Sequence, residues 1–109
     1  MRLKHYNTSI VGGTEATIAL DSPTDSFIGN LNLVIVTSTT SENVAIYYTD
    51  TTNETTSTKR IFLEVFSTAG SYHREIKGIA LSPGFKLVID SSASTTVQAF
   101  LWGYQDTPQ

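Results

Sequence analysis

The stretch "ALSPGFKLVIDSSASTTVQAFLWGY" (residues 80–104) decides the fold class of this chain. It divides into a turn, a strand, a second turn and a final strand. Pro83-Gly84 suits a type II turn, because proline fixes φ at the first central position and glycine accepts the positive φ needed at the second. The final strand alternates with period two, and one of its sides is formed by Val97, Ala99 and Leu101. This pattern predicts two antiparallel β-strands joined by a tight turn.

The other side of the final strand is aromatic, and it consists of Phe100, Trp102 and Tyr104. A strand in a two-layer sandwich buries one face and normally carries polar residues on the other. Three coverings are therefore open for the aromatic side: a long loop, another subunit, or a ligand on a bare platform. Phe62 and Phe66 raise the same question in "RIFLEVF". Because interface centres are rich in aromatic residues, we predict that these five side chains form a subunit interface.

Alternating strands recur along the rest of the chain. They are separated by turns rich in Gly, Pro, Asn, Asp, Ser and Thr, and no stretch has a helical period. The strand-like stretches are "EATIAL", "FIGNLNLVIVTST", "NVAIYYT", "RIFLEVF", "SYHREIKGI", "FKLVID" and "TTVQAFLWGY". We predict an all-β fold, an antiparallel, jelly-roll-like β-sandwich of seven to eight strands. The expected organisation is an N-terminal arm (1–9), one sandwich domain (10–105) and a C-terminal tail (106–109).

Composition narrows the classes of partner. The chain has 109 residues, 39% hydrophobic and 16% charged, with a formal net charge of −3. No Lys or Arg lies between His5 and Thr58, so the clustered cations needed to bind nucleic acid or an acidic membrane surface are missing there. There is no cysteine, which excludes thiolate chemistry. The N-terminal stretch has no apolar signal-peptide core, so we expect synthesis in a cytosol.

Catalytic and metal motifs are absent from the sequence. His5 and His73 are far apart and have no metal-ligand spacing, and no serine lies in a G-x-S-x-G elbow. Asp21 and Asp25 flank a proline turn and have oxygens suited to calcium, but without an EF-hand pattern we interpret them as turn residues. A pair of carboxylates in a cleft, as in glycosidases, is the enzymatic arrangement that the sequence leaves open. We predict no enzyme activity, no cofactor and no metal.

The order of strands and turns resembles that of small tailed-phage virion proteins. The resemblance rests on "NLNLVIVTSTTSENVAIYY" and on the C-terminal layout, with its Leu81-Ser82-Pro83-Gly84 turn, a Ser-rich turn at 91–94 and a last strand closing near Gly103. Such proteins include head decoration (cement) proteins, head fibres, and neck or tail components. The resemblance implies a structural or adhesive sandwich that is oligomeric, frequently trimeric. It also implies assembly in the host cytoplasm on other virion proteins such as the major capsid protein. It carries over no catalytic residue.

Two functions follow from these features as expectations. The preferred one is a capsid decoration protein or another virion-surface protein. The alternative is a fibre-tip adhesion or carbohydrate-binding module, since sugars also stack on aromatic rings. No Asp or Asn cluster accompanies the aromatic residues in the sequence, which favours the structural function. Arg2, Lys4 and His5 predict that the arm docks on a neighbouring subunit or an acidic patch of the shell, and a frayed terminus is the other interpretation.

Overall fold

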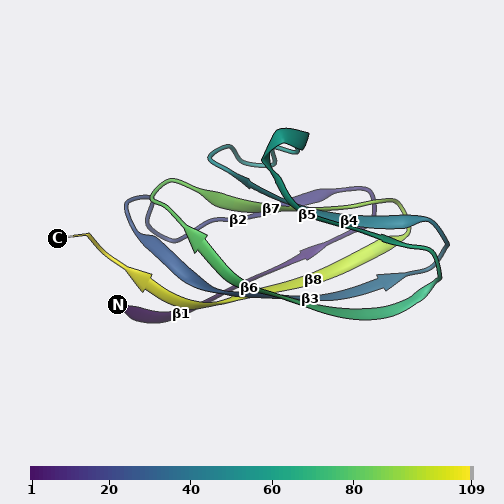
Figure 1. The fold of residues 1–109 in the computed structure, drawn as a ribbon, viewed down its shortest axis with the longest axis horizontal. Helices are drawn as coiled ribbons and strands as arrows, with labels where there is room; N and C mark the ends of the chain where they lie inside the picture. The colour runs from purple at the N-terminus through teal and green to yellow at the C-terminus, as the bar shows by residue number, and fades with distance from the viewer. Residues whose placement is uncertain (109) are drawn as a thin grey trace.

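The computed structural model describes residues 1–108 and consists almost entirely of strands (Figure 1). The strands are β1 (Arg2–Ile10), β2 (Glu15–Ile18), β3 (Ser26–Thr37), β4 (Glu42–Thr49), β5 (Arg60–Phe66), β6 (Gly70–Leu81), β7 (Lys86–Ser91) and β8 (Thr95–Asp106). In this part of the chain the helical structure is a single 3₁₀ turn, η1 (Ser57–Lys59), and no helix is long and apolar enough to cross a membrane.

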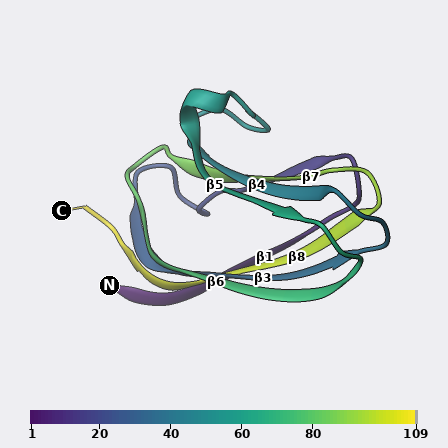
Figure 2. The same cartoon turned by 45° about the vertical axis from the view of Figure 1, so that its right-hand side comes forward.

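Two four-stranded antiparallel sheets face each other in Figures 1 and 2. The first sheet has the order β1-β8-β3-β6 and the second has the order β2-β7-β4-β5. The pairs β4–β5, β3–β6, β2–β7 and β1–β8 make one long hairpin ribbon, which rolls up so that β3 also pairs with β8 and β4 with β7. This arrangement is an eight-stranded jelly roll, so the predicted fold class is confirmed.

The core lies between the two sheets and follows the period-two pattern. Val97, Ala99 and Leu101 of β8 are at most 1% exposed and face the opposite sheet. They belong to one buried cluster with inward residues from the other strands, among them Leu31, Leu33, Ile35, Val44, Ile46, Leu87 and Ile89. Burial of these aliphatic side chains is the main force that holds the sheets together.

The predicted N-terminal arm is instead the first strand of the sandwich. β1 pairs with β8 along its whole length, from Arg2 opposite Gln105 to Ile10 opposite Val97. The sequence shows no clear apolar alternation here because β1 is an edge strand. Its inward positions Lys4, Tyr6 and Thr8 are only partly buried and include polar residues. The expectation that residues 1–9 precede the sandwich is therefore wrong.

A long loop, residues 50–59, covers part of the outer face of the second sheet and lies above it in Figure 1. Three hydrogen bonds join it to β2 and β7: the Asn53 backbone N–H donates to Thr17 Oγ1 at 2.8 Å, Thr17 Oγ1 donates to Asn53 Oδ1 at 2.8 Å, and Lys86 Nζ donates to Thr52 Oγ1 at 3.4 Å. Ala45, Tyr47 and Val88 form a small buried cluster outside the main core. A loop thus covers an outer face of this protein, but on the second sheet and not over the aromatic residues of β8.

Candidate functional site on the aromatic face

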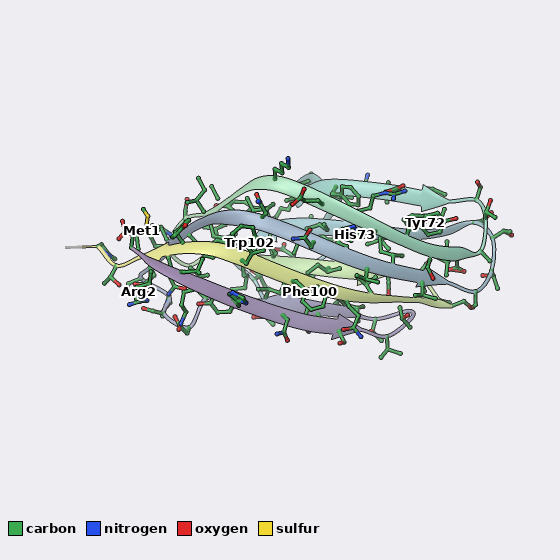
Figure 3. All side chains as sticks on the ribbon, turned by 90° about the horizontal axis from the view of Figure 1, so that it is seen from below. Met1, Arg2, Tyr72, His73, Phe100 and Trp102 are labelled. Carbon is green, nitrogen blue, oxygen red and sulfur yellow. The ribbon has the colours of Figure 1, made fainter. Side chains whose placement is uncertain are left out.

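The aromatic side chains of β8 lie on the outer face of the first sheet, which Figure 3 shows from below. Phe100, Trp102 and Tyr104 are 42%, 41% and 48% exposed. They alternate with buried residues, because successive side chains of a strand point to opposite faces. Since β8 is a central strand of its sheet, the aromatic residues run along the middle of a broad surface.

Strand register places a polar or aliphatic neighbour on each side of every aromatic ring. Tyr104 lies between Leu3 and Ile28, Trp102 between His5 and Asn30, and Phe100 between Asn7 and Asn32. The amides of Asn7, Asn30 and Asn32 therefore surround the aromatic rings, although the sequence showed no Asn cluster beside them. Their proximity depends on β1, β3 and β8 meeting in one sheet, and no local sequence pattern carries that information.

Aliphatic side chains extend the apolar surface at both ends of the aromatic row. Leu3, Ile28, Val34 and Val36 are 57%, 53%, 40% and 45% exposed on this same outer face. Asp, Glu, Lys and Arg are absent from the outward positions of β1, β3 and β8, apart from Asp106 at the end of β8. We call the outward side chains of these three strands the aromatic face.

Two glycines let β3 and β8 approach closely beneath the aromatic face. Gly29 lies opposite Gly103, and a Cβ atom on Gly29 would be 2.1 Å from the carbonyl oxygen of Trp102. A Cβ atom on Gly103 would be 2.2 Å from the carbonyl oxygen of Ile28. Both contacts are with backbone, which cannot swing aside, so this pair of positions accepts only glycine. The close approach fixes Trp102 beside Asn30.

The remaining predicted interface residues, Phe62 and Phe66, do not join this face. Phe66 is 3% exposed and its ring centroid lies 4.5 Å from that of Tyr72, while Phe62 packs against the core. The outward side of β5 includes Leu63 and Val65, which lie opposite Ala45 and Asn43 of β4. The prediction for Phe62 and Phe66 was wrong because "RIFLEVF" is apolar on both sides, so its sequence does not reveal which side faces the core.

Two of the three residues predicted to dock on a neighbour form ion pairs within this chain. Arg2 Nη2 donates to Asp25 Oδ2 at 3.2 Å, and Lys4 Nζ donates to Asp21 Oδ2 at 2.5 Å. These bonds hold the β2–β3 loop against β1, which contradicts a free basic arm. The hydrogen bonds from Lys4 and then Gln105 lower the pKa of Asp21 to about 2. Only His5 lies on the aromatic face.

Gln105 completes this cluster from β8 and is fully buried. Its Nε2 donates to Asp21 Oδ1 at 2.7 Å and to Asp25 Oδ2 at 2.6 Å, and its Oε1 accepts a hydrogen bond from the Tyr6 hydroxyl. Asp21 and Asp25 thus have protein donors as partners. The sequence offered no signal for Gln105, which reads as an ordinary polar position after the last strand residue.

The candidate catalytic groups are scattered over the structure. His5 lies on β1 and His73 on β6, at the two opposite edges of the first sheet. Register sets Glu15 opposite Asp90 on the second sheet, where desolvation and then the charge of Glu15 raise the pKa of Asp90. Among residues 1–108, no group of three or more His, Asp or Glu side chains is placed to hold a metal ion.

Comparisons with known proteins add little to this description. No protein-family model matches the chain, and no curated protein is significantly similar to it in sequence. A solved structure from Bacillus endospore appendages, described as a novel family of disulfide-linked pili, is similar over 98% of this chain and 89% of its own. The identity is 16% and the TM-score is 0.47, and this degree of similarity establishes no shared function.

Proposed function

We propose that this protein is a non-enzymatic structural component that assembles with further copies of itself through the aromatic face. The observation that carries the proposal is the exposure of seven large apolar side chains on one outer face of a fully formed jelly roll. Monomeric soluble proteins rarely expose an extended apolar patch without a function for it.

The composition of the aromatic face matches the centre of a protein interface. Interface centres are enriched in Trp, Tyr and Phe and depleted in charged residues. Here the three rings lie along the midline of the sheet, and their neighbours on β1 and β3 are uncharged or imidazole side chains. Trp102, between His5 and Asn30, is the expected hot spot, because tryptophan dominates the energy of many interfaces.

The particle in which this assembly takes place is proposed to be a virion. The chain would then act as a capsid decoration protein or another virion-surface protein, bound to the major capsid protein, in line with the layout described for residues 80–104. Jelly rolls are a recurrent architecture of viral capsid proteins, which supports this context. A trimer stays the predicted oligomeric state.

The mass of the purified protein tests the assembly proposal. We expect light scattering after gel filtration at micromolar concentration to give more than the 11.9 kDa of one chain. The double variant Phe100→Ser, Trp102→Ser should form smaller oligomers than the wild type, with a lower mass by light scattering. Val11→Ser is the matched control, since Val11 is an apolar residue, 69% exposed, in the turn after β1. A wild-type monomer, or a double variant of unchanged mass, would contradict the proposal.

A carbohydrate-binding function is the second candidate, and the amides beside the rings favour it. Asn7, Asn30 and Asn32 carry both donors and acceptors for sugar hydroxyls, next to rings on which a sugar can stack. The exposed aliphatic residues at both ends of the face, such as Ile28 and Val36, favour a protein partner over a sugar.

Fluorescence separates the two candidates, because Trp102 is the only tryptophan. Assembly should shift its emission as the protein concentration rises, with no added ligand. Sugar binding should shift the emission on addition of a soluble polysaccharide while the mass stays constant. A shift with a polysaccharide alone would favour the second candidate.

A further inference from the structure

His5 brings an imidazole to the aromatic face. It lies on β1 directly opposite Trp102 of β8, and opposite Cβ atoms of paired strands are about 4.5–5.5 Å apart. Its neighbours on the same side of β1 are Leu3 and Asn7, and Asn30 of β3 lies on the far side of Trp102. The imidazole is therefore next to the side chain that we expect to contribute most to the interface.

Imidazole is the side-chain group that gains a charge close to neutral pH, ordinarily near pH 6.5. The neutral ring can be buried against apolar and amide side chains. The protonated ring loses its water when another copy covers it, and burial of a charge without a partner is far more unfavourable than burial of a neutral polar group. A position that is exposed in the free chain and covered in the assembly thus binds a proton better in the free chain.

We propose that His5 makes self-assembly through the aromatic face depend on pH, with copies associating when the imidazole is neutral and separating when it is protonated. This inference rests on the proposed function and adds its regulation. By linkage, protons that bind the free chain more tightly than the assembly shift the equilibrium towards the free chain.

The groups near His5 on the first sheet do not offset a positive charge. Tyr104 of β8 is diagonally across from His5, and a phenol is uncharged near neutral pH. Asp106 is at the end of β8, where its Oδ1 lies 3.3 Å from the N-terminal amine. Arg2 and Lys4 are on the opposite side of β1, in ion pairs with the β2–β3 loop.

The second sheet, which packs behind β1, adds no partner for the imidazole either. The inward residues of β2 and β7 are apolar and belong to the core. The charged side chains of these two strands therefore point away from the first sheet; they are Glu15, Lys86 and Asp90. Interface centres are depleted in charged residues, so the covering surface of another copy is not expected to supply a carboxylate.

The dissociation constant of the oligomer at pH 7.5 and at pH 5.5 tests the proposal. Light scattering over a dilution series at one ionic strength measures it. If the assembly excludes the proton, each buried imidazole that ordinarily titrates near pH 6.5 should raise the dissociation constant about tenfold between these two pH values. Circular dichroism should show one fold at both, since Asp21 and Glu54, with pKa values of about 2, keep their charge.

Two substitutions at the exposed His5 separate charge from shape. His5→Gln cannot gain a proton, so its assembly at pH 5.5 should be as tight as at pH 7.5. His5→Arg is charged at both pH values, and its assembly should be about tenfold weaker than that of the wild type already at pH 7.5.

His73→Gln is the matched control. His73 is also exposed, on β6 at the other edge of the same sheet, and it shares that strand's outward side with Glu75 and Lys77. It lies outside the aromatic face, so His73→Gln should keep the pH dependence of the wild type.

The outcomes distinguish this inference from the proposed function. A wild type that assembles equally well at both pH values, or more tightly at pH 5.5, overturns the inference and leaves the proposed function standing. The same holds if His5→Gln keeps the pH dependence or if His73→Gln abolishes it. A wild type that is monomeric at both pH values overturns the proposed function, and the inference with it.

Discussion

Replacing Gln105 with leucine should destabilise the sandwich, although glutamine is a polar residue near the end of the last strand. Gln105 is fully buried, and Asp25, which accepts one of its hydrogen bonds, is 2% exposed. In the variant the Asp25 carboxylate keeps only its bond from Arg2. A buried acceptor that loses its donor is not rehydrated, so the cost is the full desolvation of that group.

The magnitude follows from the bonds that are lost. A hydrogen bond to a buried charged group contributes about 1.5–3 kcal/mol, and the Tyr6 hydroxyl loses an acceptor worth about 1 kcal/mol. Asp21 is exposed and water replaces its lost bond, so nothing is added for it. The expected loss of unfolding free energy is about 2.5–4 kcal/mol, or roughly 10 °C or more in Tm for a domain of this size.

Urea unfolding at one fixed protein concentration measures this loss by linear extrapolation. Gln98→Leu is the matched control, because Gln98 is on the same strand but exposed, and its effect should stay within about 0.5 kcal/mol. Gln105→Glu adds a third carboxylate, so it should be less stable at pH 7 than at pH 4. If Gln105→Leu unfolds within about 0.5 kcal/mol of the wild type, the buried network does not stabilise the fold and the reasoning is wrong.

Three further predictions concern other parts of the chain. Gly103→Ala should give little or no folded protein by circular dichroism, because its Cβ meets backbone at 2.2 Å, and a folded variant with wild-type Tm would contradict this. Deleting residues 2–8 removes most of β1 from beside β8 and should abolish cooperative thermal unfolding, whereas a free arm would leave it unchanged. The pKa values of Asp21 and Glu54 lie at about 2, below the ordinary 3.8 and 4.5, owing first to bonds from Lys4 and Thr49 respectively. The stability that these two carboxylates contribute should be complete above about pH 4.5 and lost as the pH falls towards 2. The unfolding free energy of Asp21→Asn and of Glu54→Gln, measured between pH 4.5 and 2, should therefore change less with pH than that of the wild type.

The fold could be predicted because its information is local. Alternation with period two and turn residues such as Pro83-Gly84 specify short antiparallel strands, and β7 and β8 lie on either side of the predicted Ser-rich turn. The prediction of which side of β8 faces the core was also correct, because Val97, Ala99 and Leu101 are aliphatic and the residues between them are not.

The errors arose where two sides of a strand look alike. In β5 both sides are apolar, and only the packing of Phe66 against Tyr72 decides which faces the core. In β1 both sides are largely polar, since the edge of a sheet needs little apolar area, and the strand was mistaken for an arm. Periodicity reports that a strand alternates, but its phase is set by tertiary contacts.

The residues around the aromatic rings could not be predicted from the sequence, for a different reason. Asn7, Asn30 and Phe100 come from three strands that are widely spaced in the chain, and they meet only through the register of the first sheet. The burial of Gln105 likewise depends on the β2–β3 loop folding back over the end of β8.

The rolled ribbon also constrains the order in which the chain can fold. β8 follows the other seven strands in the chain, yet it lies in the interior of the first sheet, between β1 and β3. Until β8 has been synthesised, β1 has no partner in its sheet and one edge of β3 is open. A chain without β8 therefore has β1 and β3 in place but no strand between them to pair with both. The β1–β8 pairing joins residues that are almost the whole chain apart, and the entropy of closing so long a loop makes this pairing slow. The first sheet is therefore complete only when the strand that carries Phe100, Trp102 and Tyr104 lies between β1 and β3.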